Sequence, residues 1–236
     1  MEAGELAKMT KGGCGFDVCG LKYISHRYKF IYFEVPKTGT RSVLDLLTEP
    51  AELTRMERRL GFLEYSHYRR FAFVRNPWGR LLSCYQNKIK KDKNFQATHF
   101  QNGVMKKFHK FNVFYAGMPF GEFVHAVGKI PDEFADGHFA SQYRRLILEN
   151  EIVVDHLARF ETFRDEIGSF LTTVGMDVSL EVPHLNSSET GKPYQEYYDE
   201  ETIRVVEERF KEDIRLFGYQ FDQTTADSPV RPGSPA

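Results

Sequence analysis

The sequence has no long hydrophobic run. None of its 236 residues lies in an apolar stretch of roughly eighteen residues, the length that a membrane-spanning helix requires. Residues 1–5 also lack the basic-then-apolar pattern of a secretory signal peptide. We therefore expect no stable membrane insertion and a cytoplasmic location, or targeting by means that the chain does not show.

Cysteine is scarce, and the three cysteines form no pattern that indicates a metal or disulfide site. Cys14 and Cys19 lie in a glycine-rich N-terminal stretch, and no second pair is present to complete a zinc site. Cys84 lies in an apolar, helix-like segment, where a buried reduced thiol is expected. We therefore predict no metal site and assign no function to Cys14 or Cys19.

Net charge is nearly absent as well. The chain carries 32 Lys and Arg residues against 33 Asp and Glu residues, and this net charge of −1 predicts no nucleic-acid partner. Hydrophobic residues make up 41% of the chain, enough for the core of one domain of this length. We expect an N-terminal extension over residues 1–26, one folded domain over 27–221 and a disordered tail over 222–236.

A strand-like run is followed by a hydroxyl-rich loop and then by a helix-like segment. The run covers residues 28–35 and the helix-like segment residues 43–47. The first N–H groups of a helix have no partner within it and carry partial positive charge, so a loop at this place favours an anion. We predict a phosphate or sulfate on the residues of this loop, which are Pro36, Lys37, Thr38, Gly39, Thr40, Arg41 and Ser42.

A second motif begins where another short strand, residues 70–74, runs into a helix. Asn76 is a plausible N-cap and Pro77 a favoured first helical residue, which places Arg75 at the carboxyl end of the strand. Ligands of open α/β sheets gather at these ends. Ser83 follows about 9 Å further along the helix axis, near enough to share one phosphate with Arg75. Taken singly, either residue has an ordinary alternative, a surface ion pair for Arg75 or a bond back to its own helix for Ser83.

Together, the two motifs resemble those of sulfotransferases. The loop 36–40 is similar to their 5′-phosphosulfate loop, and segment 73–85 is similar to their 3′-phosphate motif. The resemblance is to the carbohydrate sulfotransferase family (Golgi-type, family 2), here without a membrane anchor. It extends through an "Arg-Phe-Glu" element in 157–163 and through a C-terminal region that begins at 184. Many relatives carry a second glycine where this chain has Thr40, followed by Arg41.

The resemblance implies a fold, a donor and a reaction. The fold would be α/β, a P-loop-like three-layer sandwich with a central, mainly parallel sheet flanked by helices. The donor would be 3′-phosphoadenosine 5′-phosphosulfate (PAPS), which transfers its sulfuryl group to a carbohydrate hydroxyl and leaves as 3′,5′-ADP (PAP). Lys37 would stabilise charge on the leaving group, whereas Arg75 and Ser83 would hold the 3′-phosphate. Ser187 and Ser188 are further candidates for binding the nucleotide.

An acceptor hydroxyl also needs a general base, for which histidine is well suited near neutral pH. Among the eight histidines, His138 lies in a stretch that resembles the family's "His-(Phe/Trp)-x-x-Gln" element, which faces the acceptor. We predict that His138 is the catalytic base. Glu34 and His67 are the reserve candidates.

Positive charge is concentrated between Arg80 and Lys110, where eight Lys and Arg residues stand against Asp92 alone. Phenylalanines and His99 are interleaved with these cations. The segment 88–115 is either a solvated face or a lid and acceptor wall, which would suit an acidic sugar or a small aromatic alcohol.

Two other functions would also use a phosphate-binding loop or a nucleotide clamp. A small-molecule kinase should show a Walker lysine or acids arranged for magnesium, and neither pattern is present. A non-catalytic nucleotide-binding module would keep Arg75 and Ser83 but dispense with Lys37 and His138. Sulfation of a small-molecule alcohol remains the alternative to a carbohydrate acceptor. Further elements are predicted as helices over 120–127, 162–174 and 199–216 and a strand over 151–157.

Overall fold

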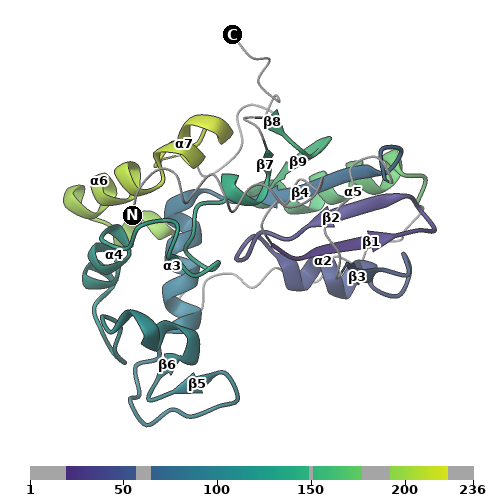
Figure 1. The fold of residues 1–236 in the computed structure, drawn as a ribbon. Coiled ribbons are helices and arrows are strands. Elements are labelled where there is room, and N and C mark those ends of the chain that lie inside the picture. Colours follow the sequence, from purple (N-terminus) through teal and green to yellow (C-terminus); the bar gives the residue numbers. More distant parts are fainter. Residues whose placement is uncertain (1–19, 57–64, 149–150, 177–191, 223–236) are drawn as a thin grey trace, which may run out of the picture.

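The computed structural model describes residues 20–56, 65–148, 151–176 and 192–222 (Figure 1). Residues 223–236 of the tail predicted for 222–236, and residues 1–19 of the extension predicted for 1–26, lie outside this part of the chain. The same is true of four residues considered above, Cys14, Cys19, Ser187 and Ser188. No helix in the described ranges is both long enough and apolar enough to cross a membrane.

A five-stranded sheet forms the centre of the fold, in the order β3-β1-β2-β4-β9. Strand β2 pairs in parallel with β4, and β4 pairs in parallel with β9, whereas β1 is antiparallel to both β2 and β3. Four strands therefore run in one direction and β1 runs in the other. The strands are β1 (Lys22–Ser25), β2 (Phe30–Phe33), β3 (Thr54–Met56), β4 (Arg69–Val74) and β9 (His156–Arg159).

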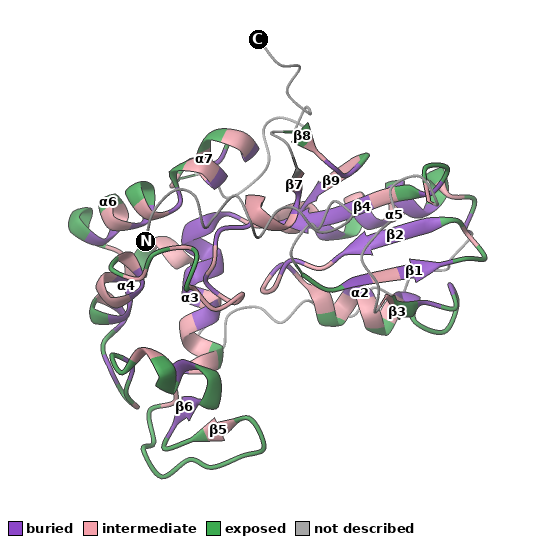
Figure 2. Cartoon of the chain, viewed as in Figure 1, coloured by how far each residue is buried: buried purple, intermediate pink, exposed green. Residues whose placement is uncertain are grey.

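Both faces of the central strands are covered, which explains the apolar runs in their sequences. All four residues of β2 are buried, as expected for a strand between two layers (Figure 2). Phe30 and Tyr32 pack in one hydrophobic cluster with residues of α2 (Thr40–Leu47) and α5 (Phe163–Thr173). Ile31 and Phe33 belong to a second cluster on the opposite face. The arrangement is thus a mainly parallel α/β sheet between helical layers.

The second cluster includes residues of four further helices. Helix α3 begins at Pro77, as predicted, because the Asn76 side chain accepts a hydrogen bond from Trp78 N. Cys84 on this helix is a buried free thiol, also as predicted. In Figure 1, α4, α6 and α7 gather beside α3. These helices are α3 (Pro77–Lys88), α4 (Phe120–Gly128), α6 (Glu200–Arg209) and α7 (Lys211–Phe217).

Two predicted elements are divided in the structure. The strand expected over 151–157 is split between β8 (Glu151–Ile152), which pairs with β7 (Ile147–Leu148), and β9 in the central sheet. Asp155 marks the division, since its carboxylate accepts hydrogen bonds from the backbone and guanidinium of Arg70 on β4. The helix expected over 199–216 is broken at Phe210, whose side chain is buried in the core and whose backbone leaves the helical region.

Short elements complete the described fold. The basic segment after α3 forms a small hairpin that projects away from the central sheet in Figure 1, followed by a 3-10 turn. The short elements are β5 (Phe100–Gln101), β6 (Val104–Met105), η1 (Lys106–Phe111), η2 (Tyr143–Arg145), η3 (Phe160–Thr162) and η4 (Tyr194–Tyr197).

Candidate functional site

One cavity lies beyond the carboxyl ends of β2 and β4, where an open α/β sheet places its ligands. Its volume is about 670 Å³, within the usual range for small-molecule sites. The cavity brings together most of the residues that the two sequence motifs single out. Among its lining residues are Glu34, Pro36, Lys37, Gly39, Thr40, Arg41, Ser42, Arg75, Ser83 and His138.

The loop after β2 turns sharply to reach α2. Lys37 has a φ of 76° and Gly39 a φ of 88°, so two residues of the loop adopt left-handed backbone conformations. For lysine this conformation is strained, and strained residues of this kind concentrate at functional sites. A side chain at Gly39 would also approach the Phe160 ring to 3.0 Å. The tight turn therefore depends on glycine and holds Lys37 at the wall of the cavity.

The two threonines of the loop have different positions. The hydroxyl of Thr38 is buried and donates a hydrogen bond of 2.8 Å to Val35 O, and Thr38 is not among the residues that line the cavity. Thr40 does line the cavity, while its hydroxyl lies 3.3 Å from the same carbonyl oxygen. The Thr38 side chain thus stabilises the loop rather than facing the cavity.

The Lys37 ammonium group has no ion-pair partner among the described residues. Burial lowers the pKa of Lys37 to about 8, and the neighbouring positive charges of Lys88 and Arg75 act in the same direction. A cation in this environment favours an anionic ligand. The negative charge of the ligand would stabilise the ammonium group, which burial has deprived of contact with water. Most Lys37 side chains still carry a proton at pH 7.

Arg75 is held beside Lys37 by several contacts. Its Nη1 donates to Lys37 O at 3.3 Å, and its guanidinium lies 4.4 Å from the centre of the Phe160 ring. The Gln142 side chain accepts a hydrogen bond from Arg75 N at 2.9 Å and donates one to Arg75 O at 2.8 Å. Burial lowers the pKa of Arg75, although the nearby Glu161 carboxylate opposes this shift. The guanidinium is therefore held beside Lys37, and an arginine side chain keeps its charge at neutral pH.

Ser83 lines the same cavity from α3. Within the described ranges no residue makes a hydrogen bond with its hydroxyl, so the common bond back to its own helix is not formed. Ser83 and Arg75 can therefore both offer donors to one ligand, in agreement with the spacing argument from the sequence.

His138 approaches the cavity with one ring nitrogen already engaged. Its Nδ1 lies 2.6 Å from Asp136 Oδ1, and its backbone N–H donates to the same oxygen at 3.0 Å. When Nδ1 carries the proton, Nε2 is left as the acceptor that a general base requires. Burial lowers the pKa of His138, although the Asp136 hydrogen bond opposes this shift. The imidazole is therefore mostly neutral at pH 7.

The two reserve candidates for the base are placed differently. Glu34 lines the cavity, and burial raises the pKa of its carboxyl group, with Arg145 opposing the shift. His67 is exposed and packs against the Tyr68 ring, with 4.8 Å between ring centroids. His67 is also not one of the cavity residues, so its position gives it no contact with a ligand there.

The basic segment 88–115 contributes little to the cavity. Of its residues, Lys88 lines the cavity, and none of the others does so in the described structure. Of its aromatic side chains, Phe108 and Phe114 are buried in the second hydrophobic cluster, whereas Phe95 and Tyr115 are exposed. The interpretation of this segment as a lid or acceptor wall therefore remains a prediction.

Several residues at the site were not anticipated from the sequence. Tyr194 and Phe160 line the cavity. Tyr194 accepts a hydrogen bond of 3.0 Å from the Asn76 side chain, and Asp136 orients the predicted base. Tyr194 is distant in sequence from its partner, whereas the Asp136-Gly137-His138 spacing could have indicated the carboxylate.

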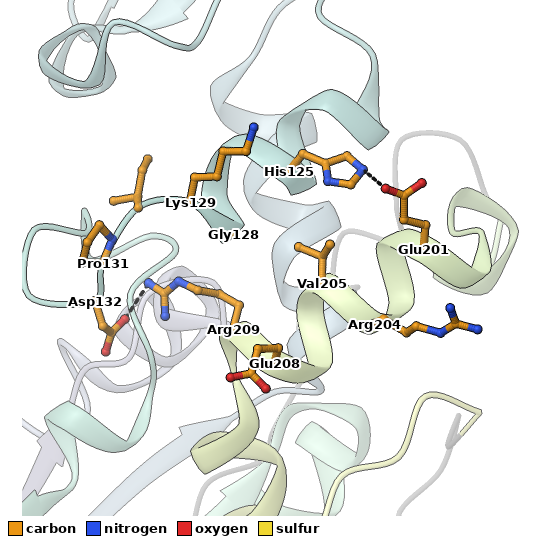
Figure 3. A pocket seen from close by; sticks show the side chains of 11 residues that line it. His125, Gly128, Lys129, Pro131, Asp132, Glu201, Arg204, Val205, Glu208 and Arg209 are labelled. Atoms are coloured by element: carbon orange, nitrogen blue, oxygen red, sulfur yellow. Dashed lines mark hydrogen bonds and ion pairs between the residues drawn. The ribbon is translucent and has the colours of Figure 1, made fainter.

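A second cavity, of about 650 Å³, lies between α4 and α6 (Figure 3). A contact of 3.5 Å between His125 Nε2 and Glu201 Oε1 and an ion pair between Asp132 and Arg209 border it. None of the residues that the sequence motifs single out is among its lining residues. The first cavity is therefore the candidate site.

Comparisons with known proteins agree with this assignment. Carbohydrate sulfotransferase 10 of Homo sapiens is 26% identical over 168 residues, which cover 65% of this chain and 47% of the relative. Carbohydrate sulfotransferase 9 of Homo sapiens is 21% identical over 218 residues, or 81% of this chain and 48% of the relative. Carbohydrate sulfotransferase 10 of Xenopus laevis is 25% identical over 237 residues, or 84% of this chain and 67% of the relative.

The chain spans about half the length of the two human relatives. No solved structure matches it significantly. The pattern that defines the sulfotransferase family matches residues 22–220, which include every strand of the central sheet and the whole cavity. The chain therefore belongs to the sulfotransferase family.

Proposed function

We propose that the protein transfers a sulfuryl group from PAPS to a hydroxyl group of a carbohydrate. The observation that carries this proposal is the meeting of Lys37, Arg75, Ser83 and His138 around one cavity in a chain of the sulfotransferase family. The finer fold assignment, a P-loop-like three-layer sandwich, rests on the same strand–loop–helix arrangement.

The charges of the cavity suit this donor. Besides Lys37 and Arg75, the lining includes Arg41, Lys88 and Lys192, against the single carboxylate of Glu34 among its described residues. PAPS carries several negative charges at its two ends. We assign the 5′-phosphosulfate to the loop 36–42 and the amino end of α2, and the 3′-phosphate to Arg75 and Ser83.

The reaction is an in-line displacement at sulfur. The acceptor oxygen forms a bond to sulfur while the bond from sulfur to the bridging phosphate oxygen breaks, and 3′,5′-ADP departs with the electron pair. Negative charge develops on that bridging oxygen, where the Lys37 ammonium and the backbone N–H groups of the loop would stabilise it.

The acceptor proton passes to His138. With Nδ1 bonded to Asp136, Nε2 is the nitrogen that takes the proton as the oxygen attacks. The resulting imidazolium is stabilised by the Asp136 carboxylate, whose pKa is held below its usual value by the hydrogen bonds from His138 although burial opposes this shift. A carbohydrate acceptor is favoured by the names of the relatives, with a small-molecule alcohol as the alternative.

Ligand-induced stabilisation and sulfate transfer together test the proposal. At about 100 times its dissociation constant, 3′,5′-ADP should raise the melting temperature by about 5 °C or more, because it binds the folded chain alone. Nucleotides without a 3′-phosphate, namely 5′-AMP, ADP and ATP, should shift it far less. A second assay follows the transfer of labelled sulfate from PAPS to a panel of glycans and alcohols. An equal shift by ATP would favour a kinase, and binding without transfer to any acceptor would favour a non-catalytic module.

A further inference from the structure

Arg80 is one of the most deeply buried charged residues of the described structure, yet it does not line the candidate site. It lies on α3, between Arg75 and Ser83 in the sequence, and only 2% of its surface is exposed. Burial lowers the pKa of Arg80 to about 10, with the Asp213 carboxylate opposing the shift, so the guanidinium is charged at neutral pH. Burying a charge costs free energy unless hydrogen bonds or ion pairs compensate for the lost contact with water.

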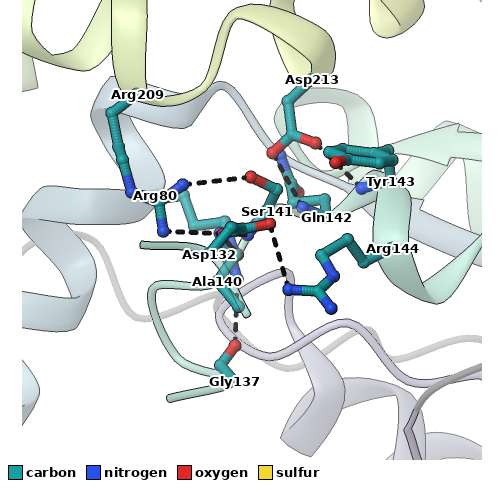
Figure 4. Close-up of polar contacts among 10 residues, drawn as sticks. All are labelled: Arg80, Asp132, Gly137, Ala140, Ser141, Gln142, Tyr143, Arg144, Arg209 and Asp213. Atoms are coloured by element: carbon teal, nitrogen blue, oxygen red, sulfur yellow. Dashed lines mark hydrogen bonds and ion pairs between the residues drawn. The ribbon is translucent and has the colours of Figure 1, made fainter. Parts of the chain in front are cut away.

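The guanidinium group donates hydrogen bonds to three backbone carbonyl groups. Nε donates to Pro36 O at 3.0 Å, Nη1 to Ala140 O at 2.8 Å and Nη2 to Gly137 O at 3.1 Å. Figure 4 shows the bonds to the segment that contains Gly137 and Ala140. Three fixed donors in one plane are a property of guanidinium that a lysine ammonium cannot reproduce.

Two of these three carbonyl groups belong to residues directly before the two proposed catalytic groups. Pro36 directly precedes Lys37, and Gly137 directly precedes His138. The helix that carries Arg80 also carries Ser83. One side chain therefore ties the donor loop, the segment of the base and the helix of the 3′-phosphate site to one another.

Other contacts hold the far side of the same segment. Asp132 Oδ1 accepts hydrogen bonds from Ser141 N at 2.9 Å and from Arg209 at 2.7 Å. Asp213 accepts hydrogen bonds from the backbone N–H groups of Gln142 and Tyr143, at 2.8 and 2.9 Å (Figure 4). The segment remains anchored by these groups when Arg80 is removed, whereas its link to the loop at Pro36 is lost.

We propose that Arg80 is a positioning residue that sets the distance between Lys37 and His138. This inference rests on the proposed function, since it gives the two loops their roles in donor and acceptor chemistry. Arg80 itself touches neither substrate. Its effect is to hold the leaving-group stabiliser and the base in one geometry, and a displacement of about 1 Å between such groups can cost on the order of 10² in rate.

The test uses Arg80→Lys and Arg80→Ala in the full chain. For Arg80→Lys we expect kcat to fall by about 10² while the dissociation constant of 3′,5′-ADP changes by less than about fivefold, because Arg75 and Ser83 keep their places. Millimolar guanidinium ion should restore part of the kcat of Arg80→Ala by filling the vacated site, whereas ammonium ion should not.

A nuclear magnetic resonance titration of the histidines gives a readout that needs no turnover. Loss of Arg80 should raise the pKa of His138 towards its ordinary value of about 6.5, because Gly137 loses its bond to Arg80 and this end of the segment can then expose the ring to water. The His138 signal is identified by its absence in His138→Gln. Arg159→Lys is the matched control, since Arg159 is another buried arginine that donates to a backbone carbonyl, Phe217 O. It should lower stability without moving the His138 pKa.

The outcomes separate this inference from the proposed function. Absence of sulfate transfer by the wild-type protein would refute the proposed function. A shifted His138 pKa in Arg80→Lys would still support the positioning role of Arg80. Three results would overturn the inference. These are an unchanged His138 pKa, an equal shift in Arg159→Lys, and a failure of Arg80→Lys to fold, which would show a general role in stability.

Discussion

Lys37→Ala should lower the rate of sulfate transfer at saturating substrate by a factor of about 10² to 10³. The side chain is held at the cavity wall by a left-handed backbone and has no ion-pair partner among the described residues, so its charge is available to the leaving group. Binding of 3′,5′-ADP should persist, because Arg75 and Ser83 remain. Initial rates and isothermal titration of the two proteins measure both effects.

Lys88→Ala is the control for this variant, since Lys88 is a second lysine that lines the same cavity. Removing its charge should cost about tenfold or less. Turnover of Lys37→Ala within about fivefold of the wild type would show that Lys37 does not stabilise the leaving group.

The lowered pKa of Lys37 adds a pH signature to the same prediction. In the free enzyme kcat/KM should decline as the pH rises through about 8, because the ammonium form is then lost. Lys37→Arg should move this alkaline decline to higher pH, since a guanidinium keeps its proton. An alkaline limb that stays at the same pH in Lys37→Arg would assign it to another group.

His138→Ala should lower kcat by about 10² to 10⁴, the usual contribution of a general base. Burial lowers the pKa of His138, so the base form predominates at neutral pH and is lost only as the pH falls below about 6.5. The wild-type profile should therefore show an acid limb that is absent in His138→Ala. Steady-state rates between pH 5 and 9 measure this difference.

Two further variants identify the base. His67→Ala should behave as the wild type, because His67 is exposed and does not line the cavity. Glu34→Gln should keep the acid limb, since the limb belongs to His138. Full activity of His138→Ala with loss of activity in Glu34→Gln would transfer the role to Glu34.

The local parts of the site could be predicted from the sequence because their physical causes are local. The turn at Gly39, the cap at Asn76 and the start of α3 at Pro77 depend on residues within a few positions of one another. The strands β2, β4 and β9 were recognisable as apolar runs, although Asp155 sets the beginning of β9 through a contact with Arg70, far away in sequence. The division of the C-terminal helix at Phe210 likewise follows from burial in the core.

Contacts between distant segments account for what the sequence did not reveal. The Arg80 guanidinium meets carbonyl groups that lie 44 and 60 residues away, so no spacing rule indicates its role. The Thr38 hydroxyl donates to Val35 O, so ligand binding by Thr38 stays a prediction for its backbone N–H group. Short-range patterns showed which residue types were present, and packing decided which of them face the cavity.

The crystal structure of the complex with 3′,5′-ADP tests the central claim most directly. We expect the 5′-phosphate within hydrogen-bond distance of Lys37 Nζ and the backbone of residues 38–42, and the 3′-phosphate against Arg75 and Ser83. Both phosphates should lie in the cavity beyond β2 and β4. A nucleotide bound there with its phosphates directed away from Lys37 and Arg75, or bound instead between α4 and α6, would contradict it.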